Sequence, residues 1–136
     1  MFLNMKEDKK QKFIETDDGV IICYDFCGFE NFKAAEEMMK GKIGRITGIG
    51  NSMTPILKSR QPVIVCPITE NTTFEKEDIV FCKVRGNYYL HKICSMRVID
   101  NNKEQFLIGN NHGHMNGWVN KDKIFGKVSY IIPNNV

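Results

Sequence analysis

Residues 77–93 read Glu77-Asp-Ile-Val-Phe-Cys-Lys-Val-Arg-Gly-Asn-Tyr-Tyr-Leu-His-Lys-Ile93, and this stretch decides the fold class. Two runs rich in β-branched and aromatic residues flank a central Gly-Asn pair, which is typical of a tight turn between paired strands. The stretch therefore predicts a β-hairpin, with His91 near the end of its second strand. Because side chains alternate across a strand, Tyr89, His91 and Ile93 should share one face.

The same β pattern extends over the C-terminal two thirds of the chain. Short apolar runs recur there, separated by glycine, asparagine and proline residues that favour turns. The expected strands are Arg45–Ile49, Val63–Cys66, Ile79–Val84, Tyr88–Ile93, Phe106–Ile108 and Ile124–Ile132. About six strands in ~90 residues predict a mainly β fold, built as a compact, strongly bent sheet or partial barrel.

Two further elements are expected before this region. Apolar runs on either side of Asp18-Gly19 predict an N-terminal hairpin. From Phe29 to Met39 apolar residues recur at helical spacing, and Gly41 follows as a stop, which predicts one short helix. The first residues are charged and without periodicity, as in a flexible arm. We therefore expect an arm over residues 1–11, the hairpin and helix over 12–43, and a β domain over 44–136.

The composition is that of a folded protein without disulfides. The chain has 136 residues, of which 42% are hydrophobic and 26% charged, and its net charge is +3. A chain of this length can bury a core without covalent staples. Its lysines are dispersed, which argues against a dedicated nucleic-acid surface. No apolar run approaches the ~18 residues of a membrane span, and the N-terminus is too polar for a signal peptide.

The five cysteines are interpreted as reduced thiols. Their number is odd, none forms a C-x-x-C pair, and most lie inside apolar runs. Buried thiols of this kind are typical of a reducing compartment. We therefore expect a soluble protein of the cytoplasm, including that of a phage-infected host.

A second stretch carries the candidate chemistry. Residues 48–57 read Gly48-Ile-Gly-Asn-Ser-Met-Thr-Pro-Ile-Leu57, so that a serine follows two glycines at the end of an expected strand. Glycine lets the backbone turn sharply and leaves room beside Ser52 for a substrate chain. A nucleophilic serine needs that exposure, and it needs N–H groups around Gly50 and Met53 to hold an oxyanion. A neutral histidine such as His91 is a competent base near pH 7. Ordinary turns have the same composition, so this signal alone is modest.

Taken together and in order, these features resemble the LexA and signal-peptidase superfamily of serine peptidases. The matches are Ser52, Met53 and Pro55 in the nucleophile turn, Asp78, Ile79 and Val80 in the second motif, His91-Lys92 at the catalytic dipeptide, and closing elements in Leu107-Ile-Gly-Asn-Asn and Ile124-Phe-Gly-Lys-Val. The resemblance covers residues 44–132. It implies the β fold of that superfamily and a Ser52–His91 dyad. Bacterial signal peptidases and LexA-type proteins use lysine as the base, whereas endoplasmic-reticulum and archaeal signal peptidases use histidine.

The chain departs from the pattern of the superfamily at three places. It has Arg60-Gln61-Pro62 where Gly-Asp is usual, and Glu77 where glycine is usual. It also has Asn110 where the histidine-type enzymes have the aspartate that orients the base. We expect Asn110 or Asn111 to orient His91, because an asparagine carbonyl can fix a histidine tautomer but supplies no charge. The resemblance then implies a weak catalyst or none. Asp122 is the nearest downstream carboxylate, and the sequence does not place it at the site.

Three functions remain open at this point. The leading hypothesis is a peptidase that binds an extended peptide or protein substrate against an exposed sheet edge, with no cofactor. The second is a catalytically inactive module of a phage or mobile element, which binds a protein partner or a second copy of itself. The third is a regulator that cleaves itself at Cys27-Gly28, 25 residues before Ser52.

Two other features receive a structural interpretation. His112-Gly-His114 could bind a metal ion, but no third ligand stands out by its spacing. We therefore favour a structural or substrate-lining loop there. Lys92 is interpreted as a solvated strand end, since it could act as a base only if the strand register slipped by one residue and turned His91 away.

Overall fold

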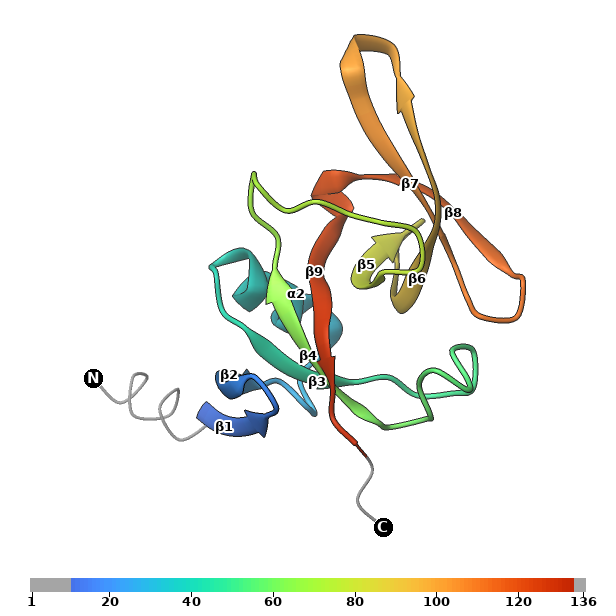
Figure 1. Cartoon of the computed structure of the whole chain (residues 1–136). Helices are drawn as coiled ribbons and strands as arrows, with labels where there is room; N and C mark the ends of the chain where they lie inside the picture. Colours follow the sequence, from blue (N-terminus) through green and yellow to red (C-terminus); the bar gives the residue numbers. More distant parts are fainter. Residues whose placement is uncertain (1–10, 134–136) are drawn as a thin grey trace.

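The computed structural model describes residues 11–133 of the chain. Within them the chain forms a nine-stranded mixed sheet in the order β1-β2-β3-β4-β9-β5-β6-β7-β8 (Figure 1). The strands are β1 (Gln11–Thr16), β2 (Gly19–Asp25), β3 (Gly44–Thr47), β4 (Pro62–Pro67), β5 (Ile79–Val84), β6 (Asn87–Ile99), β7 (Lys103–Gly109), β8 (Met115–Asn120) and β9 (Ile124–Ile131), with 3-10 turns η1 (Asp100–Asn102) and η2 (Lys121–Lys123). The sheet is not closed, because β1 and β8 are its two edges. The expectation of a mainly β fold is confirmed.

The N-terminal hairpin is part of this sheet. Strands β1 and β2 pair in antiparallel fashion up to Thr16 and Gly19, so the hairpin is confirmed. Its turn residues are Asp17 and Asp18, one position before the expected Asp18-Gly19 pair. Strand β2 then pairs in parallel with the start of β3, over Tyr24↔Gly44 and Asp25↔Arg45. The hairpin therefore extends the sheet beyond β3. The arm expected over residues 1–11 lies outside the described residues except for Gln11, which belongs to β1.

The helix α2 (Asn31–Met39) follows β2 and packs against β4 and β9 (Figure 1). Its buried face consists of Ala34, Ala35 and Met38. Gly41 ends the helix with φ +95°, as expected of a C-terminal glycine. Close packing requires a second glycine on β9, because a Cβ at Gly126 would meet atoms of both Val65 and Met38. No helix in residues 11–133 has the length and apolar content to cross a membrane.

Strand β5 is buried on both faces and separates two hydrophobic clusters. The first cluster, with α2, comprises Phe26, Ala34, Ala35, Met38, Ile46, Met53, Leu57, Val63, Val65, Ile79, Phe81 and Phe125. The second, enclosed by β6, β7 and β8, comprises Val80, Cys82, Val84, Ile93, Phe106, Ile108, Val119 and Ile124. Alternate β5 side chains enter opposite clusters, as the two-residue period of a strand requires. This double burial explains why β5 is apolar at every position except Lys83, which is only partly buried.

The C-terminal half is more extended than the sequence patterns predict. Strand β6 continues to Ile99, and the far part of the β6–β7 hairpin projects from the rest of the molecule (Figure 1). Its apolar residues are correspondingly exposed, with Val98 at 65%. Strand β8 was not expected at all. Its sequence, Met-Asn-Gly-Trp-Val-Asn, contains three residues of low β propensity, and only Val119 is buried.

The five cysteines are all free thiols, as the sequence predicts. Cys23 and Cys82 are fully buried, and burial raises the pKa of Cys82 to about 12. A thiol that is not deprotonated near neutral pH is a poor nucleophile. These two cysteines therefore act as small core residues.

Candidate active site

Ser52 lies in the loop of residues 48–61, which joins β3 to β4 and is called here the nucleophile loop. Gly50 turns the backbone with φ +106°, and its N–H donates to Ser59 Oγ at 2.9 Å. Just beyond Ser52, the side chains of Met53 and Leu57 are buried in the first cluster, at 4% and 5% exposure. The loop is therefore anchored on both sides of Ser52, whose side chain remains partly exposed.

Ser52, His91 and Asn116 form a hydrogen-bonded series. Ser52 Oγ lies 3.1 Å from His91 Nε2, and His91 Nδ1 lies 2.7 Å from Asn116 Oδ1. The amide oxygen of Asn116 can only accept, so Nδ1 of His91 bears the proton. Nε2 is then unprotonated and accepts the hydrogen bond from the Ser52 hydroxyl. This is the arrangement in which a histidine can remove a proton from a serine.

The surroundings of His91 keep its imidazole neutral. The residue lies on β6 opposite Val80 and is 8% exposed, and the ring of Tyr89 packs against it with 4.8 Å between centroids. Burial lowers the pKa of His91, the hydrogen bond that His91 donates to Asn116 opposes this effect, and the nearby His114 lowers the pKa further. A histidine that is neutral near pH 7 can accept a proton.

The residues expected to orient His91 lie elsewhere. Asn110 Oδ1 accepts the backbone N–H groups of His112 and His114, at 2.8 and 3.0 Å, and so shapes its own loop. Asn111 directs its side chain to the nucleophile loop. The expectation that Asn110 or Asn111 would hydrogen-bond His91 is therefore wrong. The chain reverses over residues 110–114, and β8 then brings Asn116 back beside the imidazole.

Lys92 is not the solvated strand end that the sequence analysis expects. Its side chain is only 15% exposed and forms an ion pair with Glu77 at 2.8 Å. It also donates to Asn111 Oδ1 at 3.2 Å. As the neighbour of His91 on one strand, it projects from the opposite face. Asp122 is exposed in η2. Among residues 11–133, the side-chain partner of His91 Nδ1 is the amide of Asn116 and not a carboxylate.

A cleft of about 320 Å³ opens beside Ser52 and His91. One wall is residues 46–50, and another is residues 88–91; Cys27 and Gly28 line it as well. Within the described residues, the pairing of β2 with β3 ends at Arg45, and that of β6 with β7 begins only at Lys92. Each wall therefore presents a backbone edge with no strand paired to it.

His112 and His114 have no third candidate metal ligand grouped with them in the described part of the chain. Among residues 11–133, no three His, Cys, Asp or Glu side chains are grouped so that they could hold a metal ion. His112 instead contacts the nucleophile loop through Asn51 and Thr54.

No protein-family model matches the chain, and no curated protein matches it.

Proposed function

We propose that this protein is a serine peptidase of the LexA and signal-peptidase type, which its sequence resembles. The observation that supports this most directly is the series Ser52–His91–Asn116, with separations of 3.1 and 2.7 Å. The series borders a cleft of about 320 Å³. A serine hydroxyl, an unprotonated imidazole nitrogen and a binding space beside them are what acyl transfer requires.

In the proposed reaction, Ser52 Oγ attacks the carbonyl carbon of a peptide bond while its proton passes to His91 Nε2. The N–H groups of Ser52 and Met53 stabilise the oxyanion of the tetrahedral intermediate. His91 then gives its proton to the leaving amine, and a water molecule hydrolyses the acyl-enzyme by the reverse proton path. Asn116 holds the tautomer of His91 throughout. It carries no charge to stabilise the imidazolium, so the enzyme is expected to be slow.

The backbone conformation at two departures from the superfamily pattern supports the proposed membership. Arg60 and Glu77 occupy positions where that superfamily has glycine. Their φ angles are +64° and +77°, in the left-handed region that favours glycine. The backbone at these positions is therefore of the kind the superfamily pattern implies, although the side chains differ.

The substrate is proposed to be an extended polypeptide. The cleft has a free backbone edge at residues 46–50 and another at residues 88–91. A peptide lying between them as an added strand could form main-chain hydrogen bonds with either edge. Apolar side chains of the first cluster, among them Leu57 and Phe81, line the cleft and favour an apolar substrate side chain.

The proposal is tested by intact-protein mass spectrometry after incubation with a fluorophosphonate. We expect one adduct on the wild type, none on Ser52→Ala, and a strongly reduced amount on His91→Ala. Ser129→Ala, which removes an exposed hydroxyl on β9, is the matched control and should be labelled like the wild type. If the folded wild type gains no adduct, the catalytic proposal fails and the binding or assembly module becomes the better account.

A second candidate function is self-cleavage at the Cys27–Gly28 bond. The observation in its favour is that both residues line the same cleft as Ser52 and His91. Cleavage would divide the chain into residues 1–27 and 28–136, which a mass spectrum of the incubated protein resolves. The two fragments should form in the wild type and not in Ser52→Ala. A chain that stays intact while it still reacts with the fluorophosphonate would leave cleavage of other polypeptides as the function.

A further inference from the structure

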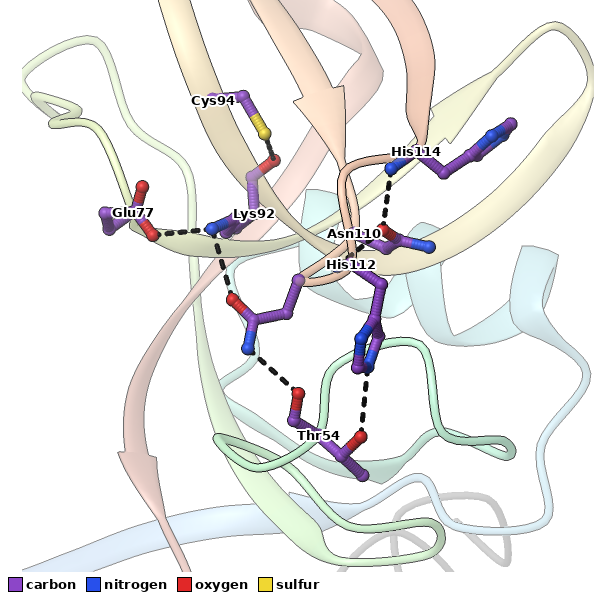
Figure 2. Close-up of polar contacts among 8 residues, drawn as sticks. Thr54, Glu77, Lys92, Cys94, Asn110, His112 and His114 are labelled. Atoms are coloured by element: carbon purple, nitrogen blue, oxygen red, sulfur yellow. Dashed lines mark hydrogen bonds and ion pairs between the residues drawn. The ribbon is translucent and has the colours of Figure 1, made fainter.

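The nucleophile loop is held from outside the cleft by residues 110–114, called here the clamp loop. The backbone N–H of Asn111 donates to the carbonyl of Ser52 at 2.9 Å, and its side-chain Nδ2 donates to the carbonyl of Thr54 at 2.9 Å. His112 Nε2 lies 3.0 Å from the carbonyl of Asn51. It also lies 3.1 Å from Thr54 Oγ1 (Figure 2). Three of these four contacts thus fix carbonyl groups around the candidate nucleophile, those of Asn51, Ser52 and Thr54.

The direction of each hydrogen bond is determined by its partners. A lysine ammonium can only donate, so the Asn111 atom beside Lys92 is Oδ1, and the Nδ2 group faces Thr54. Glu77 in turn holds Lys92 (Figure 2). The carbonyl of Asn51 can only accept, so Nε2 of His112 bears a proton. The contacts therefore form one consistent network that runs from Glu77 to the nucleophile loop.

Fixing these carbonyl groups also orients the N–H groups that matter for the reaction. In a trans peptide unit the C=O and N–H bonds lie in one plane and point in opposite directions. The carbonyl of Asn51 shares its unit with the N–H of Ser52, and the carbonyl of Ser52 shares its unit with the N–H of Met53. Because both carbonyls point to the clamp loop, both N–H groups point away from it. Neither N–H has a hydrogen-bond partner within residues 11–133.

We propose that Asn111 and His112 are positioning residues that orient the Ser52 and Met53 N–H groups as an oxyanion-binding pair. This inference rests on the proposed function for its chemical meaning. Oriented donors stabilise an oxyanion only if their direction is fixed before the reaction. Neither residue lines the cleft beside Ser52, and both act through the backbone of the nucleophile loop.

Two variants remove separate parts of the clamp. Asn111→Asp keeps the side-chain shape and the acceptor for Lys92 but loses the donor to Thr54. His112→Ala removes the clamp-loop donor to the carbonyl of Asn51, which then keeps, among the described residues, only the N–H and hydroxyl of Thr54 as partners, at 3.2 and 2.9 Å. His112→Gln, whose amide can donate from a similar position, is its conservative partner. Asn71→Asp makes the same chemical change as Asn111→Asp at an exposed loop residue and serves as the matched control.

The first readout is the second-order rate constant for fluorophosphonate labelling of Ser52. We expect it to fall roughly tenfold or more in Asn111→Asp and His112→Ala, since small misplacements of reacting groups have effects of this size. His112→Gln should recover most of the rate, and Asn71→Asp should retain all of it. The midpoint of the pH profile should stay unchanged, because His91 keeps its surroundings. Labelling of both clamp variants at the wild-type rate would overturn the inference while leaving the peptidase proposal intact.

The second readout does not depend on activity. The amide NMR signals of Ser52 and Met53 should be single and sharp in the wild type, and should broaden or multiply in Asn111→Asp and His112→Ala, with signals of the sheet unchanged. If the wild type cannot be labelled, the proposed function fails, and this measurement still decides whether the clamp orders the loop. Unchanged Ser52 and Met53 signals in both variants would refute the clamp in either case.

Discussion

At the scale of single residues, Asn116 determines how strong a base His91 can be. Its carbonyl oxygen fixes the Nδ1–H tautomer at 2.7 Å but adds no negative charge. We predict that Asn116→Asp increases the rate of Ser52 labelling about tenfold at neutral pH, because a charge-assisted hydrogen bond is roughly twice as strong as a neutral one. The pKa of His91 should rise in the same variant.

The measurement for Asn116→Asp is the labelling rate across pH, with the His91 pKa followed by NMR. Asn120→Asp on the same strand is the control, since Asn120 bonds to Gln105 and not to the site. A labelling rate that stays the same or falls in Asn116→Asp, in a folded protein, would show that Asn116 does not orient the base.

The lowered pKa of His91 also predicts a pH-dependent stability. Burial keeps this pKa below 6.5 in the folded state, so between the two values the unfolded state binds more protons. The free energy of unfolding should therefore fall as the pH drops below 6.5 and level off below the folded-state pKa. Above 6.5 the residue imposes no such loss. In His91→Gln this pH-dependent contribution to the free energy of unfolding should vanish. Urea unfolding of both proteins measures it between about pH 4.5 and 7.5, roughly the range in which histidine titrates. Parallel curves for the two proteins would contradict the buried, neutral His91.

At the scale of elements, the packing of α2 against the sheet depends on a missing side chain. A Cβ at Gly126 on β9 would meet Val65 and Met38, which are both fully buried. We predict that Gly126→Ala lowers the free energy of unfolding by about 1–3 kcal/mol through overpacking. Gly48→Ala is the control, because a Cβ there would make only ordinary contacts with Leu90, at 3.7 and 3.9 Å. Denaturant unfolding measures both, and equal small effects would contradict the tight packing of α2.

The sequence predicted some of these elements and missed others. The hairpin of β5 and β6 was predictable, because two apolar β-prone runs flank a pair of turn-forming residues. Its turn is Arg85-Gly86 and not the expected Gly86-Asn87, since Asn87 pairs with Val84. Strand β8 was not, because Asn116 and Gly117 weaken its β pattern, and it is held mainly by pairing with β7. Since Asn116 lies on this unexpected strand, the sequence pattern points instead to Asn110 and Asn111 as partners of His91. Pairing between strands is a tertiary effect that local patterns do not contain.

At the scale of the whole molecule, β5 couples the two hydrophobic clusters into one folding unit. Its alternate side chains enter the first and the second cluster. If β5 left the sheet, the apolar residues of both clusters would therefore be exposed to water. We predict that Phe106→Ala, in the second cluster, lowers the free energy of unfolding by about 3–5 kcal/mol. Unfolding should remain one transition, with Trp118 fluorescence and far-UV circular dichroism changing together. A separate, earlier loss of the fluorescence signal would mean that the β6–β8 region unfolds on its own.

The candidate site also combines residues that the sequence could pair with residues that only the fold brings together. Ser52 and His91 could be paired from the sequence, because the order of the motifs resembles that of a known superfamily. The clamp by Asn111 and His112 could not, since those residues are 59 and 60 positions after Ser52 and only the fold brings them behind the nucleophile loop. A motif indicates which groups react, whereas the packing of loops determines what holds them.

The measurement that tests the account most directly is the pH dependence of the rate constant for fluorophosphonate labelling of Ser52, in the wild type and in His91→Ala. The account predicts that the wild-type rate rises with pH through one ionisation whose midpoint lies below 6.5, the ordinary pKa of histidine. In His91→Ala the rate should be low and should lack that ionisation. Labelling of Ser52 that is equally fast without His91, or a folded wild type that is never labelled, would contradict the claim that these two residues form a catalytic pair.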